Sequence, residues 1–283
     1  MNLARAPIVG HPMIMRRAAW TAIVVGAAAC GGSLGDVAEP VEPIDAVADP
    51  LEAIHPGETM RFEVRLAGVL GGEASFTTGE PTTRDDRTTI VLASRLRSAG
   101  ALALVKDIRD EATTILDLAT RAPLATTSDV RANPRDYHSE TTYVGNTATL
   151  AYTPKKGDPL TLHYDFGAEA IHDAHSAMIE LRVWDAAPGT ERTLWVLGGR
   201  RVWRAAMTMA EPEVIDTYVG NQPAIRIDGI ATRAHPNLTI DPARKPRTFS
   251  VWLSDDADRV PFRVVAKTEL GDVVIELVDY QRP

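Results

Sequence analysis

Two histidines three residues apart could act together on a metal ion. His172 and His175 flank Asp173 in the segment "IHDAHSAMIELR", which has helical periodicity. On a helix this spacing could present two imidazoles to one ion, and His163 could supply a third ligand from the preceding strand. Hydrogen-bonded burial beside the apolar stripe of the helix explains the same histidines without a metal. We prefer that interpretation, because no further ligands accompany them, and we expect neither a metal nor another cofactor.

The other catalytic and ion-binding patterns of the sequence are incomplete. Ser176 follows His175, but no G-x-S-x-G motif or strand–turn–helix pattern places it at a nucleophile elbow. The segment "DDAD", residues 255–258, lacks the spaced ligands and final glutamate of a calcium loop and predicts an acidic hairpin turn. We therefore expect no enzymatic activity. A metal-dependent enzyme that uses His172 and His175 is the least favoured alternative.

Four tryptophans could line an apolar cavity for a lipid or another hydrophobic ligand. They lie in or beside strand-like segments, at Trp184, Trp195, Trp203 and Trp252. The alternative is ordinary core packing, since only 6% of the residues are aromatic and a large domain needs them inside. Both interpretations remain open at this point.

The only cysteine of the chain, Cys30, ends an apolar run. Two arginines precede residues 18–29, which are too few to span a bilayer as a helix and are typical of a signal peptide. Three alanines lead into Cys30 and resemble a bacterial lipobox, although Ala27 replaces the usual leucine. In such signals the cysteine is acylated and becomes the mature N-terminus. A plain signal peptide is the alternative.

The segment after Cys30 is acidic and rich in proline, so it cannot bury enough surface to fold. We predict a signal peptide at 1–29, the lipidated cysteine and its tether at 30–56, and a single β-rich domain at 57–283. No aspartate follows Cys30 to suggest retention at the inner membrane. By resemblance to other Gram-negative lipoproteins, we expect an outer-membrane lipoprotein facing the periplasm, with a soluble periplasmic protein as the alternative.

The body of the chain alternates apolar and polar residues over short runs. Residues 58–68, "ETMRFEVRLAG", show the period of two that a half-buried strand requires. Similar runs separated by turn residues continue to the C-terminus and predict an antiparallel sheet, sandwich or barrel. Two helices are expected among them, a short one at 98–107 and a longer one at 167–183.

Three segments resemble the domain-of-unknown-function 3108 family of bacterial envelope proteins. They are "GETMRFEVRLAGVLGGEASF", "IHDAHSAMIELR" and "FSVWLSDDADRVPFRVVAKTELGDVVIELVDY". The resemblance spans about residues 57–281 and implies a strongly curved antiparallel sheet, a half-barrel or barrel similar to lipoprotein carriers, with one central helix and one short helix. It implies no activity.

These observations together favour a binding module for a lipid or another hydrophobic envelope molecule. The alternative is a structural or interaction protein in envelope maintenance that has no small-molecule ligand. We expect contact with the membrane through the lipid anchor. The net charge of −8 argues against a nucleic-acid partner, which calls for a basic face.

Overall fold

The computed structural model describes residues 53–283, apart from 85, 105, 133, 135 and 269–270. The predicted signal peptide, Cys30 and almost all of the predicted tether therefore lie outside the described residues. Within the described part, no helix is both long and apolar enough to cross a membrane.

Most of the described chain is β-strand, as the alternating sequence predicts. In chain order the strands are β1 (Thr59–Leu66), β2 (Val69–Thr78), β3 (Thr82–Arg84), β4 (Arg87–Ser98), β5 (Arg109–Asp117), β6 (Pro123–Arg131), β7 (Tyr137–Val144), β8 (Thr147–Pro154), β9 (Leu160–Asp165), β10 (Ile171–His172), β11 (Glu191–Gly198), β12 (Arg201–Met209), β13 (Glu213–Thr217), β14 (Gly220–Ala234), β15 (Arg247–Ser254), β16 (Pro261–Thr268) and β17 (Gly271–Gln281). Helix α1 (Gly100–Ala103) follows β4, and helix α2 (Ala174–Arg182) follows β10.

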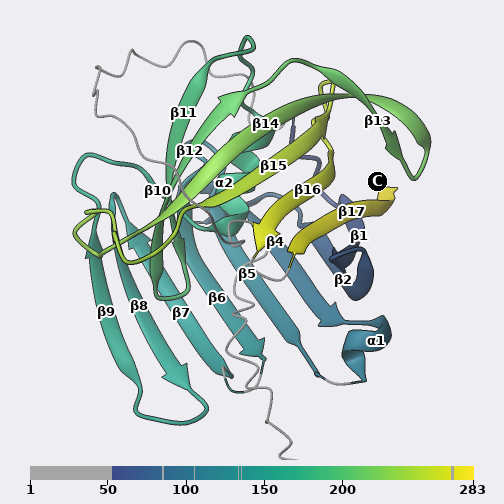
Figure 1. The fold of residues 1–283 in the computed structure, drawn as a ribbon. Coiled ribbons are helices and arrows are strands. Elements are labelled where there is room, and N and C mark those ends of the chain that lie inside the picture. Colours follow the sequence, from purple (N-terminus) through teal and green to yellow (C-terminus); the bar gives the residue numbers. More distant parts are fainter. Residues whose placement is uncertain (1–52, 85, 105, 133, 135, 269–270) are drawn as a thin grey trace, which may run out of the picture.

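The strands pair into one strongly curved sheet that does not close (Figure 1). The pairings run β10–β11–β12–β14–β15–β16–β17–β1–β2–β4–β5–β6–β7–β8–β9, while β3 pairs with β4 and β13 with β14. Every pairing is antiparallel except that of the two-residue β10 with β11, which is parallel. The predicted curved β sheet is therefore confirmed, and this short parallel pairing is the exception to its antiparallel character.

The two end strands of the sheet, β9 and β10, are not paired by backbone hydrogen bonds in the described residues. Side chains connect them instead. A hydrophobic cluster contains Tyr164 of β9, Ile171 of β10 and Trp195 of β11, together with Leu150 of β8. Its members are at most 9% exposed. Apolar burial contributes about 25 cal/mol per Å², so this contact can hold the open seam together without a ladder.

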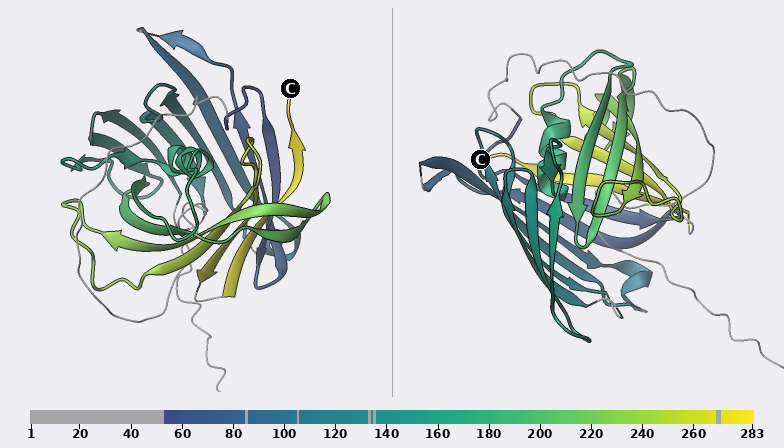
Figure 2. Two further views of the ribbon diagram at one scale, coloured as in Figure 1. Left: turned by 90° about the horizontal axis from the view of Figure 1, so that it is seen from above. Right: turned by 90° about the vertical axis from the view of Figure 1, so that its left-hand side faces the viewer.

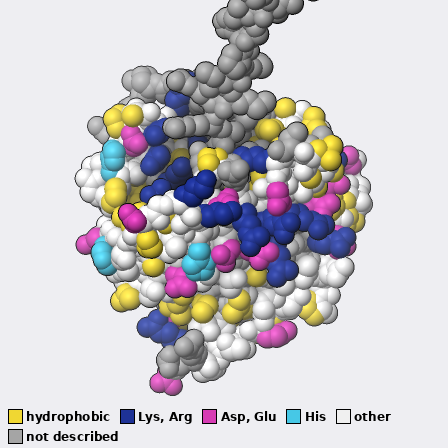
Figure 3. Space-filling model, turned by 90° about the horizontal axis from the view of Figure 1, so that it is seen from below, with side chains coloured by type: hydrophobic (Ala, Val, Ile, Leu, Met, Phe, Trp, Pro, Cys, Tyr) yellow, Lys and Arg dark blue, Asp and Glu magenta, His cyan; other side chains and the backbone are white. Residues whose placement is uncertain are grey.

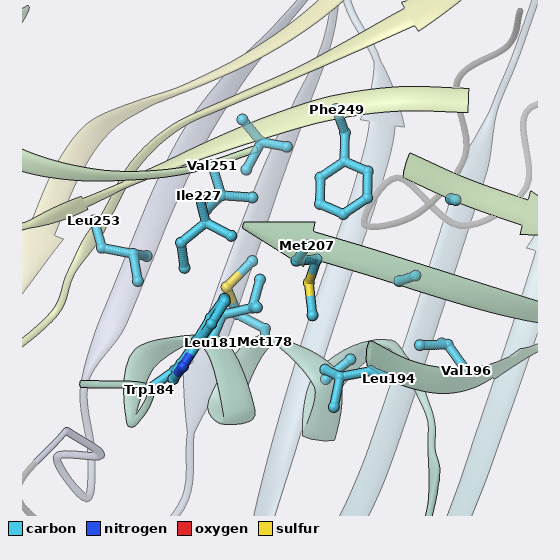
Figure 4. Packing of buried hydrophobic residues seen from close by; sticks show 14 of the residues in the cluster. Met178, Leu181, Trp184, Leu194, Val196, Met207, Ile227, Phe249, Val251 and Leu253 are labelled. Carbon is cyan, nitrogen blue, oxygen red and sulfur yellow. The ribbon is translucent and has the colours of Figure 1, made fainter. Parts of the chain in front are cut away.

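Helix α2 lies inside the curve of the sheet, between its two halves (Figure 2). One side of the helix presents Met178 and Leu181, with Trp184 just beyond its end, to the strands on the β11–β16 side. Figure 4 shows these three side chains pointing toward Ile227, Val251 and Leu253. The central helix expected from the sequence therefore sits in the concave face of the sheet.

The long helix begins seven residues later than the sequence predicts, at Ala174 instead of Gly167. Asp173 caps it: its carboxylate accepts from the Ser176 amide at 2.8 Å, and Ser176 Oγ accepts from the Asp173 amide at 2.9 Å. Ile171 is buried as the helical stripe requires, but it is buried in β10, paired with Trp195. The short helix expected at 98–107 spans only Gly100–Ala103, because β4 continues to Ser98.

All residues of α2 from His175 to Arg182 are buried, the polar ones included. Buried polar groups must find partners inside the protein. Arg182 pairs with Glu58, and Glu180 pairs with Arg121 and Arg192. The remaining polar residues of the helix face the sheet at the site described next.

Candidate functional site: a cavity beneath the central helix

A hollow forms where four neighbouring strands all present a small side chain to the concave face. Ser94 of β4 lies opposite Ala112 of β5, which lies opposite Ser128 of β6, which in turn lies opposite Ser139 of β7. Directly opposed residues of neighbouring strands lie on the same face of a sheet. Four small side chains in one row leave a gap between the sheet and the elements packed over it.

This gap is a cavity of about 180 Å³. An apolar cavity of about 150 Å³ is enough to take up a molecule of the size of benzene. The wall facing the row of small residues is apolar and comes from β1, α2, β11, β16 and β17, through Met60, Phe62, Met178, Leu197, Val264 and Ile275. The cavity therefore has a hydroxyl-bearing floor and a hydrophobic roof.

A second row crosses the same floor closer to the strand ends. Leu96, Asp110, Val130 and Tyr137 are successive neighbours on β4 to β7. Leu96, Asp110 and Tyr137 of this row line the cavity, near the ends of β5 and β7, at an edge that we call its rim; Val130 packs in a buried cluster with Ile108 and Ala132. Burial raises the pKa of the Asp110 carboxyl to about 6.

A hydrogen-bonded chain runs from the cavity floor to the cap of α2. Ser94 Oγ lies 2.8 Å from Nε2 of His175, whose Nδ1 lies 2.8 Å from Thr114 Oγ1. Thr114 donates to the Asp173 carboxylate, which also accepts from Thr126 at 2.8 Å. Since Thr114 donates its proton to Asp173, it accepts from Nδ1–H of His175, and Nε2 then accepts from Ser94.

The order serine, histidine and acid is that of hydrolases, but two features weaken it as a catalytic device. Thr114 separates the imidazole from the carboxylate, so the charge of an imidazolium would not be directly paired. Burial also lowers the pKa of His175, although Asp173 opposes this, and the imidazole is therefore a poor proton acceptor. These hydrogen bonds fix α2 on the sheet. Because Ser94 donates its proton to His175, its oxygen remains available as an acceptor at the cavity.

The carboxylate of Asp173 is ionised within this network. Burial opposes the charge, but the hydrogen bonds from Thr114 and Ser176 hold the pKa of Asp173 below its ordinary value. Ser176 serves only this cap, donating to Asp173 Oδ1 at 2.7 Å.

The histidines that the sequence offers as weak metal-ligand candidates do not come together as a helical pair. His172 lies on β10 and not on the helix, so the expected helical spacing with His175 is wrong. Its Nδ1 is buried without a partner among the described residues, and burial lowers its pKa. His163 lies on β9 beside Thr149 Oγ1 at 3.1 Å. Within the described part of the chain, no three His, Cys, Asp or Glu side chains are grouped as a metal site.

The four tryptophans lie away from this cavity. Trp184 and Trp203 belong to the core around α2, and Trp195 belongs to the cluster at the seam of the sheet. Trp252 is half-buried and donates Nε1–H to Glu213 at 2.6 Å. Core packing, the alternative left open by the sequence, accounts for the first three.

The acidic segment 255–258 forms the turn between β15 and β16, as its sequence predicts. Asp256 Oδ1 accepts from the Ser254 hydroxyl at 2.6 Å and from the Asp258 amide at 3.1 Å. These oxygens stabilise the turn itself.

Outside the cavity, charged side chains of both signs share the surface. Figure 3 shows Lys and Arg side chains in a row across the face seen from below, with Asp and Glu beside them. On the outer face of the sheet, Arg97 pairs with Glu73 at 2.6 Å and Arg95 approaches Glu111 at 4.0 Å, all of them well exposed. Such exposed pairs contribute about 0–1 kcal/mol each, so they neither fix the fold nor define a site.

Sequence reasoning missed Ser94, Ala112, Asp110 and the rest of the cavity floor. The hydrogen bonds that hold α2 over this floor join residues that are far apart in the sequence, such as Ser94 with His175 and Thr114 with Asp173. The one local signal was the cap, since Asp173 and Ser176 stand three residues apart before an apolar run.

Comparison with solved structures finds one protein with this fold and two weaker matches. A β-barrel-like protein of the domain of unknown function DUF1849 from Brucella abortus matches with a TM-score of 0.54 at 9% identity, over 81% of this chain and 98% of that one. A protein inferred to be exported, with a YmcC-like fold, from Bacteroides fragilis matches at 8% identity and a TM-score of 0.36, over 80% and 96% of the two chains. A protein inferred to be a lipoprotein, from Parabacteroides distasonis, matches at 10% identity and 0.36, over 80% and 95%.

At these identities the match to the Brucella protein shows the fold alone. No curated protein sequence matches the chain. The model of the protein family of unknown function DUF3108 matches residues 61–278, which include the whole cavity floor and α2. The resemblance found in the sequence is thereby confirmed, and the chain belongs to the DUF3108 family.

Proposed function

We propose that this protein is a binding module of the bacterial envelope, which holds a small apolar molecule or the apolar end of a lipid beneath α2. The observation that carries the proposal is the cavity of about 180 Å³ with an apolar roof. Close packing is the rule in protein interiors, and an unfilled apolar volume lowers stability. A ligand that fills it would restore the lost contacts.

The sequence supports the setting of this function. The apolar run before Cys30 and the acidic tether after it would hold the domain at a membrane, facing the periplasm. Exchange of a lipid with that membrane would then need no soluble carrier. A structural or interaction role without a ligand is the competing hypothesis, and it predicts an empty cavity.

Filling the cavity tests the proposal. Ala112→Phe places a ring on the floor, whereas Thr113→Phe places the same ring on the exposed outer face of the same strand. The full chain carries Cys30→Ala in both cases, so that acylation does not intervene. Displacing even two methylenes of ligand, at about 0.8 kcal/mol each, lowers affinity about tenfold.

Two measurements are compared among the three proteins: binding of a fluorescent apolar probe, and native mass spectrometry of material purified without detergent. We expect the parent and Thr113→Phe to bind the probe and to retain lipid, and Ala112→Phe to lose both. Equal binding by all three, or no binding by the parent, would refute the proposal in favour of a scaffold.

A further inference from the structure

Asp110 is a half-buried acid that has no partner among the residues the structure describes. It lines the cavity, and the described residues give its carboxyl neither a hydrogen bond nor an ion pair. By contrast, the fully buried acids near α2 are all paired: Glu58 with Arg182, Glu180 with Arg121 and Arg192, and Asp173 with its hydroxyl donors. Desolvation of a carboxylate that has no partner is costly, so the place of Asp110 in the lining of a cavity calls for a ligand group.

The other titratable groups of the cavity do not supply that partner. They are Arg95, Tyr137, Tyr143, Asp173, His175 and Arg182. Arg95 approaches Glu111 on the outer face, Arg182 is paired with Glu58, and Asp173 and His175 are joined through Thr114. Beyond Tyr137, Arg200 stacks on Tyr152 at 4.4 Å. The floor is therefore acidic and rich in acceptors.

The arrangement of the two rows gives the ligand a direction. Asp110 lies at the rim, whereas Met60, Phe76 and Met178 line the cavity away from that row. Ser94 donates its proton to His175, so its lone pairs also accept from a ligand. A ligand with a polar group at the rim and an apolar chain pointing inward would match both Asp110 and the apolar lining.

We propose that the cavity selects a single-chain amphiphile with a primary ammonium group, which pairs with Asp110 while its chain lies under the apolar roof. This inference rests on the proposed function and names its ligand class. An ammonium supplies three donors and a charge opposite to that of Asp110. A carboxylate at the same end would meet the Asp110 charge and would be rejected.

The test compares three probes of equal chain length, namely decylamine, decanol and decanoate, by titration calorimetry on the full chain with Cys30→Ala. At pH 7.5 we expect the amine to bind about tenfold more tightly than the alcohol, the gain of one charge-assisted pair, and decanoate to bind most weakly. At pH 5, where about nine tenths of the Asp110 carboxyls with a pKa of about 6 are protonated, the affinity for the amine falls about fivefold, toward that of the alcohol.

Asp110→Asn removes the charge without changing the size of the side chain. This variant should bind amine and alcohol equally and lose the pH dependence, while still binding decanol like the parent. The matched control is Glu111→Gln, which makes the same change one residue away, on the outer face of β5, where Glu111 is 60% exposed. It should keep the preference for the amine.

The outcomes separate the two proposals. The parent could bind decanol and decylamine equally well, with no change in its affinity for decylamine at acidic pH. In that case the inference about the ammonium group is wrong and the binding function stands. If none of the three probes binds the parent, the proposed function itself fails. Should Asp110→Asn not fold, the pH comparison on the parent alone still decides.

Discussion

Replacing Asp110 by asparagine should make the protein more stable at neutral pH. In the folded protein burial raises the pKa of this carboxyl from its ordinary 3.8 to about 6. A raised acid pKa means that the folded state holds the proton more tightly than the unfolded chain does. The contribution of Asp110 to stability is therefore most favourable below pH 3.8 and is lost as the pH rises through 6.

The size of the effect follows from the same two values. At about 1.36 kcal/mol for each pKa unit, the difference between 3.8 and about 6 corresponds to about 3 kcal/mol of lost stability above pH 6. Asparagine carries no charge and avoids that loss. Asp110→Asn should therefore raise the free energy of unfolding by up to about 3 kcal/mol at pH 7.5 and by almost nothing at pH 4.

Urea denaturation of the ligand-free protein across this pH range measures the effect, with Glu111→Gln as the control that should show no such trend. A destabilised Asp110→Asn variant at pH 7.5 would mean that the carboxylate has a stabilising partner. A stabilisation that does not change with pH would mean that charge is not its cause. Either result would refute the reasoning, and with it the ground for an ammonium ligand.

Three further perturbations test the fold around the site. In a double-mutant cycle on the fully buried pair Glu58–Arg182, each of Glu58→Gln and Arg182→Met should cost about 3–5 kcal/mol and the double variant much less than their sum, whereas the exposed pair Glu73–Arg97 should show under about 1 kcal/mol; additive costs at the buried pair would contradict this. Gly229→Ala should cost about 1–3 kcal/mol in thermal unfolding, because its Cβ would lie 2.2 Å from the ring of Phe249, and Phe249→Leu should recover part of that loss; a neutral Gly229→Ala would show that the ring moves freely. Asp173→Ala should cost about 2–4 kcal/mol by removing the cap and the acceptor of three hydroxyl donors, with Asp173→Asn less severe; equal costs for the two would argue against the capping role.

The strands could be predicted from the sequence because each alternation is a local signal. Residues 58–68 alternate, and β1 spans Thr59–Leu66, with Met60 and Val64 buried and Arg61 exposed. The start of the long helix could not be predicted in this way. Ile171 fits the apolar stripe of a helix and is buried, but a strand buries it equally well. The capping residue Asp173 decides the boundary, and periodicity does not register it.

The cavity could not be predicted because it depends on register. Ser94, Ala112, Ser128 and Ser139 are unremarkable residues in four separate strands, and a slip of one residue in any pairing would turn one of them to the outer face. Tryptophans are the more visible candidates in a sequence. Because their rings fill a large volume, three of the four are buried in the hydrophobic core, away from the cavity.

Two departures from the rules of stability coincide at this one place. The floor beneath α2 uses small side chains where larger ones would fill the volume. The half-buried acid beside them has no partner among the described residues, whereas the fully buried acids near α2 all have one. Each of these two features lowers the stability of the folded protein. A single substitution, such as a leucine on the floor or an asparagine at the rim, would remove it. Their occurrence on adjacent rows of the same four strands is better explained by a ligand that fills the volume and neutralises the charge than by two independent defects.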